Sequence, residues 1–420
     1  MKRTQVQGML GLSAAVLLGQ AAVADVETGI SSDEVRAIVS EMMADADDRT
    51  SLLAANSGHD GHFYIGDGGN FRLQVEGQLQ FRYIASFVDD DPVVNSDDFE
   101  GGFTATRTEL AFSGNVYDPS FLYKISGNFD RNDGDFVLED AWVGHVFESG
   151  LVMIWGQYRE PILWEDVIND HHALAVDQSV VNAVFRQDRS QGIWIHKQEE
   201  DYRFWAGFSD GIRSQNSDYT MDPADWSFTT RWEYKFDGEW SQFDSFSSAP
   251  GSDYGLKLGG GFHWQDGTED SNFGVGELEL GAWTADLMFQ GDGWNAFLMG
   301  VGLYTDPAGG DDMTDWGALV QGGFFLPDSD WELFARYDVV MPDDDRALDD
   351  NFQTLTFGAN YYIHGQAAKF TMDFQYFMDE TSENALVSDP GNSDRYERIG
   401  LLPTAEEGEF TIRAQFQLLF

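Results

Sequence analysis

The stretch FTIRAQFQLLF, residues 410–420, decides the fold class of this chain. Apolar side chains occupy every second position from Phe410 to Phe420; Thr411, Arg413, Gln415 and Gln417 lie between them, with Leu419 as the one exception. A period of two indicates a strand with one apolar and one polar face. An open apolar strand invites aggregation, whereas a closed barrel in lipid leaves no free edge, because its last strand pairs with its first. The stretch therefore favours an all-β transmembrane antiparallel β-barrel over a soluble β-sandwich.

The longest alternation in the chain covers residues 70–87 and has the same character. Its apolar face carries Phe71, Leu73, Val75, Leu79, Phe81, Tyr83 and Phe87, and its polar face carries Arg72, Gln74, Glu76, Gln78, Gln80 and Arg82. A barrel in lipid places apolar side chains outside and polar ones inside, the reverse of a soluble ligand-binding barrel. We expect the remaining strands at residues 103–116, 121–130, 136–148, 150–159, 190–197, 202–209, 226–236, 254–264, 276–290, 293–304, 315–326, 331–340, 352–363, 368–378 and 410–420. The total of about 16 is even, as single-chain bacterial barrels require.

The lengths of the connections support a barrel with two different ends. With the N-terminus in the periplasm, the outer connections are residues 88–102, 131–135, 160–189, 210–225, 265–275, 305–314, 341–351 and 379–409. The inner connections are residues 117–120, 149, 198–201, 237–253, 291–292, 327–330 and 364–367, and most of them have turn chemistry. The exception is 237–253, which is too long for a turn. No fixed-period repeat supports a β-propeller.

Aromatic residues gather at the ends of the expected strands. They include Phe121, Tyr123, Trp226, Phe228, Phe262, Trp264, Trp331, Tyr361 and Tyr362. Trp and Tyr favour the membrane interface, where the ring is in an apolar setting and the polar group stays wet. We expect these residues to form a girdle at each rim of the barrel.

The N-terminal residues 1–24 have the features of a signal peptide. Lys2 and Arg3 precede an apolar core at residues 9–18, and an Ala-Val-Ala cleavage motif ends at Ala24, so the mature chain is expected to begin at Asp25. Residues 25–69 are then expected to form a periplasmic helix and linker, with a capping box at residues 31–34 and a loop at residues 58–69. The barrel is expected to cover residues 70–420.

The composition is strongly acidic. The 420 residues include 24 Lys and Arg against 73 Asp and Glu, for a net charge of −49, and removal of Lys2 and Arg3 with the signal peptide leaves −51. Such a charge repels nucleic acid and anionic lipid. The absence of Cys excludes disulfides. Two interpretations of the acidity stay open: solvated loops in a salty habitat, or a vestibule that attracts cations.

Strand parity assigns charged residues of both signs to the lumen. The basic ones are Arg72, Arg82, Arg107, Lys124, Arg203, Arg231, Lys235, Lys257, Arg336 and Arg413. The acidic ones are Glu76, Glu109, Asp130, Glu233, Glu332, Asp338 and Asp373. The predicted wall is therefore mixed. Runs of Asp at residues 89–91, 311–312 and 343–345 make the outer loops acidic and would disfavour phosphate entry at low salt.

The fifth expected strand ends in Gly156-Gln157-Tyr158-Arg159-Glu160-Pro161, followed by Glu165. This motif, the segment from Val176 to Arg189, residues 231–234 and the terminal Phe resemble the phosphate-selective porin O/P family over about residues 70–420. The resemblance implies a homotrimeric outer-membrane porin with a constriction loop, here residues 160–189, folded into each barrel. That loop and its ends would place Arg159, Glu165, Asp166, Asp177, Arg186 and Arg189 at the narrowest point. Phe420 resembles the signal that outer-membrane barrels present to their assembly machinery.

We therefore expect a passive diffusion channel for ions and small hydrophilic solutes, weakly cation-selective at low salt. The family resemblance offers the competing expectation of a pore selective for anions, phosphate or polyphosphate, set by Arg159, Arg186 and Arg189. A barrel that tethers the envelope through residues 25–60 is a further alternative. We expect no enzymatic activity, since no Ser or His has the setting of a catalytic group. We also expect no cofactor and no metal, because His171 and His172 suit a solvated or packed loop better than a metal site.

Overall fold

The computed structural model describes residues 57–59, 63–67, 69–88, 99–220, 224–267, 278–307, 309–389, 393–402 and 407–420. The chain divides into two compact units, Met1–Ala55 and Asn56–Phe420, and the described residues all belong to the second. The predicted signal peptide, its cleavage site at Ala24 and Asp25, and the predicted periplasmic helix lie outside the described residues.

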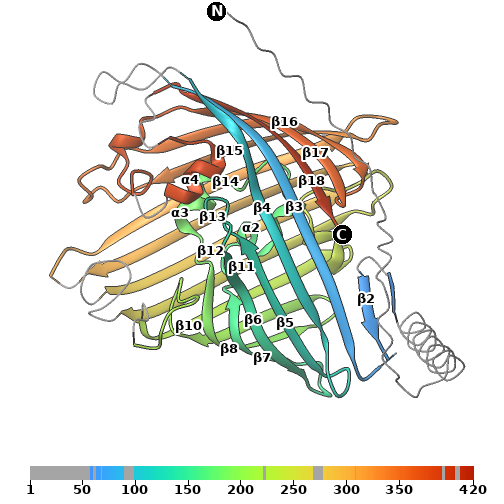
Figure 1. Cartoon of the computed structure of the whole chain (residues 1–420). Helices are drawn as coiled ribbons and strands as arrows, with labels where there is room; N and C mark the ends of the chain where they lie inside the picture. Colours follow the sequence, from blue (N-terminus) through green and yellow to red (C-terminus); the bar gives the residue numbers. More distant parts are fainter. Residues whose placement is uncertain are drawn as a thin grey trace, which may run out of the picture. The chain divides into compact units, whose positions relative to one another are not determined.

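The second unit is built around a closed antiparallel β-barrel of 16 strands (Figure 1). The strands are β3 (Arg72–Phe87), β4 (Phe99–Asn115), β5 (Phe121–Phe129), β6 (Phe136–Val146), β7 (Val152–Arg159), β8 (Arg189–Gln198), β9 (Tyr202–Ser209), β10 (Ala224–Asp237), β11 (Gly255–Gly267), β12 (Leu278–Gly291), β13 (Trp294–Pro307), β14 (Met313–Phe325), β15 (Trp331–Met341), β16 (Phe352–His364), β17 (Ala368–Phe377) and β18 (Phe410–Leu419). Each strand pairs with the next, and β18 pairs with β3, so that Phe416 lies opposite Phe81 and the barrel closes. The predicted fold class and the predicted strands are confirmed.

The two faces of the wall follow the alternation predicted from the sequence. On the outside, Phe81 is 53% exposed and Phe416 is 45% exposed. On the inside, Arg82 and Arg413 are fully buried. The prediction for Tyr362 was wrong, because this side chain points into the lumen, where its hydroxyl donates to Glu332 (2.5 Å). Its neighbour Tyr361 is exposed, and adjacent residues of a strand point to opposite faces.

A short hairpin lies against the wall beneath the end of β18. Its strands are β1 (Ser57–His59) and β2 (Phe63–Gly66), and β2 pairs with residues 72–75 of β3. The same edge of β3 pairs with β18 from Gln78 onward, and Phe420 exchanges two backbone hydrogen bonds with Gly77. The expectation of a loop at residues 58–69 was therefore wrong for these two strands, because the open edge of β3 supplies hydrogen-bond partners for β2.

Three connections contain helical segments. We call residues 160–188 the inward loop; it contains α2 (Trp164–Val167), η1 (Asp170–His172) and α3 (Val180–Phe185), and Figure 1 shows α2 and α3 within the ring of strands. We call residues 238–254 the cross-loop, which contains η2 (Trp240–Asp244) and lies at the opposite end of the barrel. The connection before β18 contains η3 (Thr381–Glu383) and α4 (Ser393–Ile399). No helix in the described ranges has the length and apolar character needed to span a bilayer.

The lumen divides into two unlike halves. The filled half faces β12–β17 and is packed with inward-pointing apolar side chains, namely Met288, Phe297, Met299, Val301, Leu319, Phe334, Val340, Phe352 and Phe377. These side chains pack with α3 of the inward loop and with Phe246 of the cross-loop. The open half faces β3–β8 and contains a cavity lined with charged groups.

Candidate functional site

The inward loop rests on the filled half through α3. Val180 and Val181 are fully buried, and α3 packs against β14 and β15. The helix begins after Ser179, whose hydroxyl accepts from the Asn182 N–H (2.9 Å), as an N-cap residue should. The Val180 N–H donates to the Asp338 carboxylate of β15 (3.1 Å). Apolar burial and a capped helix start thus fix this part of the loop to the wall.

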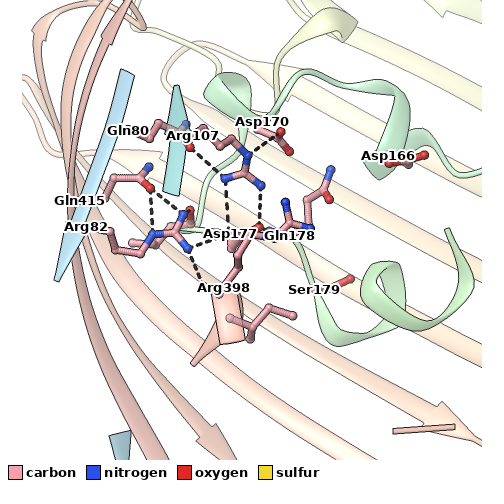
Figure 2. Close-up of polar contacts among 12 residues, drawn as sticks. Gln80, Arg82, Arg107, Asp166, Asp170, Asp177, Gln178, Ser179, Arg398 and Gln415 are labelled. Carbon is pink, nitrogen blue, oxygen red and sulfur yellow. Dashed lines mark hydrogen bonds and ion pairs between the residues drawn. The ribbon is translucent and has the colours of Figure 1, made fainter. Parts of the chain in front are cut away.

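The centre of the inward loop is held by Asp177, which lies between two arginines of the wall (Figure 2). Its carboxylate accepts from Arg82 of β3 (2.7 Å) and from Arg107 of β4 (3.1 Å). Arg82 also donates to the main-chain oxygens of Val176 (2.8 Å) and Arg398 (2.5 Å). Burial alone would raise the pKa of Asp177, but Arg107, Arg82 and Arg398 hold that pKa well below its usual range. Asp177 is therefore a permanent carboxylate at physiological pH.

Glu165 closes the inward loop on itself. Its carboxylate accepts from the Ser179 N–H (2.8 Å) and from the Ser179 hydroxyl (2.5 Å), and Arg336 of β15 lies 3.6 Å away. Burial raises the pKa of Glu165 to about 7, although Arg336 and Ser179 oppose the shift. This carboxyl therefore titrates close to neutral pH, unlike that of Asp177.

The start of the inward loop packs on a charged part of the wall. The Trp164 ring lies 3.5 Å from the Lys257 ammonium and 4.9 Å from the Arg231 guanidinium. Arg231 donates to the Ile162 main-chain oxygen (2.9 Å) and pairs with Asp286 (2.6 Å). These wall cations are therefore neutralised by neighbours and covered by the loop, so they do not face open lumen.

The cross-loop meets the inward loop inside the barrel. The His172 ring nitrogen Nδ1 lies 2.8 Å from the Asp244 main-chain oxygen, and the Phe246 N–H donates to the His172 oxygen (3.3 Å). On the far wall, Ser247 bonds to Tyr362 (3.0 Å). The length of this connection is thus explained, because it crosses the lumen instead of making a turn.

The cavity of the open half has a volume of about 280 Å³. Its charged lining consists of Glu76, Glu109, Glu139, Asp140, Asp170, Lys124, Arg159 and Arg189, so carboxylates exceed basic groups by two. Its aromatic lining consists of Trp142, Tyr158, Trp205 and Phe420. Pro161, Val167 and Asn169 of the inward loop also line it, as do Gln78 of β3 and Ala111 of β4. The cavity therefore lies between the inward loop and the barrel wall.

The basic residues at this cavity are each paired. Arg189 donates to Glu139 (2.9 Å) and Asp140 (3.0 Å), and Lys124 pairs with Asp140 (2.8 Å). Arg159 donates to the Asp166 main-chain oxygen and lies 3.8 Å from its carboxylate.

The structure brings some of the predicted site residues together and separates others. Arg82, Arg107 and Asp177 form one cluster, and Arg159 and Asp166 another. Lys124 and Arg189 share Asp140 on the cavity wall, while Arg186 pairs with Asp188 (3.1 Å). The other predicted site residues lie apart from these clusters. Glu165 and Arg336 face each other, and Arg231 donates to the main-chain oxygen of residue 162. Arg413 pairs with Asp373 (2.8 Å).

The sequence analysis missed several residues of the site. Lys369 of β17 donates to the Ala173 oxygen (3.0 Å), and its even spacing from the inward-facing Asp373 was the available signal. Trp142 and Trp205 line the cavity and share parity with Asp140 and Arg203, although aromatic residues were expected at the rims. Arg395 of α4 pairs with Asp188 (2.9 Å), and no periodic signal exists for such a loop residue.

The described residues contain no group of three or more His, Cys, Asp or Glu side chains that could hold a metal ion. The His171 ring nitrogen Nδ1 lies 2.9 Å from the Gln78 side-chain oxygen.

The barrel is similar to those of solved outer-membrane proteins. An anion-selective porin from Comamonas acidovorans has a TM-score of 0.55 at 11% identity, covering 83% of this chain and 99% of that one. The outer-membrane channel DcaP of Acinetobacter baumannii has a TM-score of 0.55 at 10% identity, covering 82% and 97%. OmpT, an outer-membrane protein of Vibrio cholerae, has a TM-score of 0.55 at 11% identity, covering 84% and 98%.

No protein-family model matches the sequence, and a search of curated proteins gives no match. The resemblance to the phosphate-selective porin O/P family therefore still depends on the sequence motifs alone. What the solved structures establish for this chain is its fold, a 16-stranded barrel of the kind that outer-membrane porins have.

Proposed function

We propose that this protein is a porin of the cell outer membrane that lets ions and small hydrophilic solutes diffuse through its barrel. The observation that carries the proposal is the cavity between the inward loop and the open half, within a wall that is apolar outside and charged inside. A loop that narrows a polar lumen selects solutes by size and charge. Two of the similar structures are described as a porin and a channel, which supports the same function here.

The proposed pore is weakly cation-selective at low salt. The chain carries a net charge of −49, and carboxylates outnumber basic groups around the cavity. The competing anion- or phosphate-selective pore depends on Arg159, Arg186 and Arg189, and each of these has a carboxylate partner. Because these partners reduce the effective positive charge of the three arginines, we favour a cation-selective pore over an anion-selective one.

Planar-bilayer recording of the purified protein tests both parts of the proposal, namely that the protein is a channel and that this channel is weakly cation-selective. Open-channel currents are expected, with a reversal potential in a KCl gradient that indicates modest cation preference at 0.01 M salt and little at 1 M, as the Debye length falls from about 30 Å to about 3 Å. Absence of conductance would favour the alternative of an envelope-tethering barrel or of an enzyme. A strong anion preference, abolished by Arg159→Gln with Arg186→Gln, would restore the phosphate-selective alternative.

The proposed partners are outer-membrane lipid around the barrel, two further copies of the chain, and the barrel-assembly machinery. OmpT of Vibrio cholerae was solved in a trimer form, with a TM-score of 0.51 to this chain at 11% identity, which supports a homotrimer here. The charge argues against nucleic acid as a partner.

Phe420 is the proposed assembly signal. We expect that its deletion leaves the barrel in the periplasm or degraded, as measured by surface labelling of cells. Truncation of residues 25–60 is the control and should leave surface levels normal. Normal surface levels of the Phe420 deletion would reject this role.

A further inference from the structure

The cavity of the open half has more carboxylates than it has bases to pair with them. Lys124 and Arg189 are both engaged with Asp140, and Arg189 also with Glu139. Asp170 pairs with Arg107 of the wall (2.8 Å). The bases on this wall are thus all occupied.

Two glutamates remain without a basic partner among the described residues. Among the described residues, Glu109 of β4 forms no side-chain hydrogen bond or ion pair, and Glu76 of β3 accepts only from Gln74 (2.8 Å) and, at 3.5 Å, from Ser113. They lie on adjacent strands, because Gln78 pairs with Glu109 and Glu76 pairs with residue 111. Both side chains are half-buried and line the cavity. Two neighbouring carboxylates that form no ion pair attract a cation and repel an anion.

Aromatic rings line the same cavity on neighbouring strands of the wall. Trp142 of β6 and Tyr158 of β7 lie edge to face, with ring centroids 6.3 Å apart. The face of an aromatic ring attracts a cation, and does so more strongly where water is excluded. Ammonium groups with apolar substituents profit most from such rings, whereas a hydrated metal ion keeps its water.

A buried amide supplies a third kind of contact. Gln78 is 7% exposed, lines the cavity and contacts His171 through its oxygen (2.9 Å), while its amide nitrogen has no hydrogen-bond partner among the described residues. A buried donor without a partner favours any solute that brings an acceptor. The register places Gln78 directly opposite Glu109, so one solute can contact both.

We propose that this cavity is a binding site for small organic cations that carry a hydroxyl group, that is, for amino alcohols such as choline. The ammonium group lies by Glu76, Glu109 and the rings of Trp142 and Tyr158, and the hydroxyl oxygen accepts from Gln78. This inference rests on the proposed channel and names the class of solute for which the channel has a specific site.

Block of the potassium current by choline in planar bilayers tests the inference. Choline is expected to reduce the KCl current in a saturable way, and Glu109→Gln is expected to weaken this block about tenfold, since a charge contact and a share of the binding free energy are lost. Glu279→Gln, at an exposed glutamate of β12 outside the cavity, is the matched control and should leave the block unchanged. Equal block in wild type and Glu109→Gln would overturn the inference.

Two further variants separate the ring and amide contacts. Trp142→Leu should weaken choline block about fivefold, and its control Trp155→Leu, on the outer face of β7, should not. Gln78→Leu should weaken block by choline and leave block by tetramethylammonium, which has no hydroxyl, as it was. Stronger block by phosphate than by choline would also overturn the inference, while loss of all conductance in the wild type would reject the channel itself.

Discussion

The filled half of the lumen and the open half hold the same loop by different physical means. Against β12–β17, apolar side chains of α3 such as Phe185 are buried in one cluster with wall residues such as Val340, as in the core of a soluble protein. Against β3 and β4, the loop is held by a buried carboxylate between two arginines, Asp177 with Arg82 and Arg107. Burial among apolar groups is non-directional, whereas charge pairs require a defined geometry.

This difference indicates which half of the lumen the proposed pore would use. The inward-pointing apolar side chains of the filled half are packed against α3 without exposed surface, so this half acts as a support for the loop. The open half keeps charged and aromatic groups in contact with the cavity. The width of the proposed pore is therefore set in the half through which no solute passes.

A charge introduced into the apolar packing of the filled half is expected to have the largest effect on the position of the inward loop. Phe185→Asp should release α3 from the wall and raise single-channel conductance several-fold, because loss of the buried ring alone costs about 3–5 kcal/mol and an unpaired buried carboxylate adds to that cost. Asn351→Asp, at an exposed position of an outer connection and away from the cavity, is the control and should keep the wild-type conductance level. Unchanged conductance of Phe185→Asp would mean that the apolar packing does not set the pore width.

Asp177→Asn tests the charged attachment of the same loop. The change leaves Arg82 with no carboxylate partner among the described residues, and breaking a buried ion pair in this way costs about 3–5 kcal/mol. We expect unstable open-channel currents and a shift of the reversal potential toward anion preference. Asp330→Asn, in the exposed turn between β14 and β15, should change neither property. Currents as steady as those of the wild type would show that contacts with the filled half alone hold the inward loop in place.

The third test asks whether the outer face is equally apolar around the open half. Ile125→Lys, at a side chain of β5 that is 50% exposed, should impair folding into bilayers by about 2–4 kcal/mol. Ala111→Lys, on the cavity side of the adjacent β4, should fold normally. Denaturant titrations in lipid vesicles provide the measurement, and equal losses for both variants would contradict the assignment of faces. A Lys substitution at Gln80 or Gln415 would be a poorer control for the lumen face, because Arg107 donates to Gln80 and Arg82 donates to Gln415.

Sequence reasoning succeeded where the membrane imposes a period and failed where the lumen is filled. All sixteen strands and both faces follow from alternation, because lipid on one side and polar groups on the other constrain each strand independently. Phe297 and Phe352 also follow the alternation, but they point into the lumen. No local pattern distinguishes an aromatic residue that faces lipid from one that packs against a loop inside the barrel. Their partners in α3 and in the cross-loop are over 40 positions away along the chain.

The candidate site was predictable only in part for the same reason. The inward loop and the residues Asp177 and Arg107 were named from the sequence, but their pairing was not, since a loop has no register. Tyr362 was assigned to the rim because aromatic residues cluster there, although strand parity alone would have placed it inside beside Glu332. Parity was the more reliable guide within strands.

The smallest expected effect is a pH dependence that separates the two attachments of the loop. Burial raises the pKa of Glu165 to about 7, whereas the arginines around Asp177 hold its pKa well below the usual range. A raised pKa means that the folded loop binds the proton more tightly than the released loop does, so this contribution is complete below about pH 4 and is lost as pH rises through about 7. The pKa of Asp177 is lowered, so its contribution to loop stability depends on pH in the opposite direction: it persists through neutral pH and is lost only in strong acid.

We therefore expect open-channel noise to increase modestly from pH 5 to pH 9, and the change should disappear in Glu165→Gln, which stays neutral. Noise that increased toward acid instead, or that kept its pH dependence in Glu165→Gln, would show that a different group governs the loop.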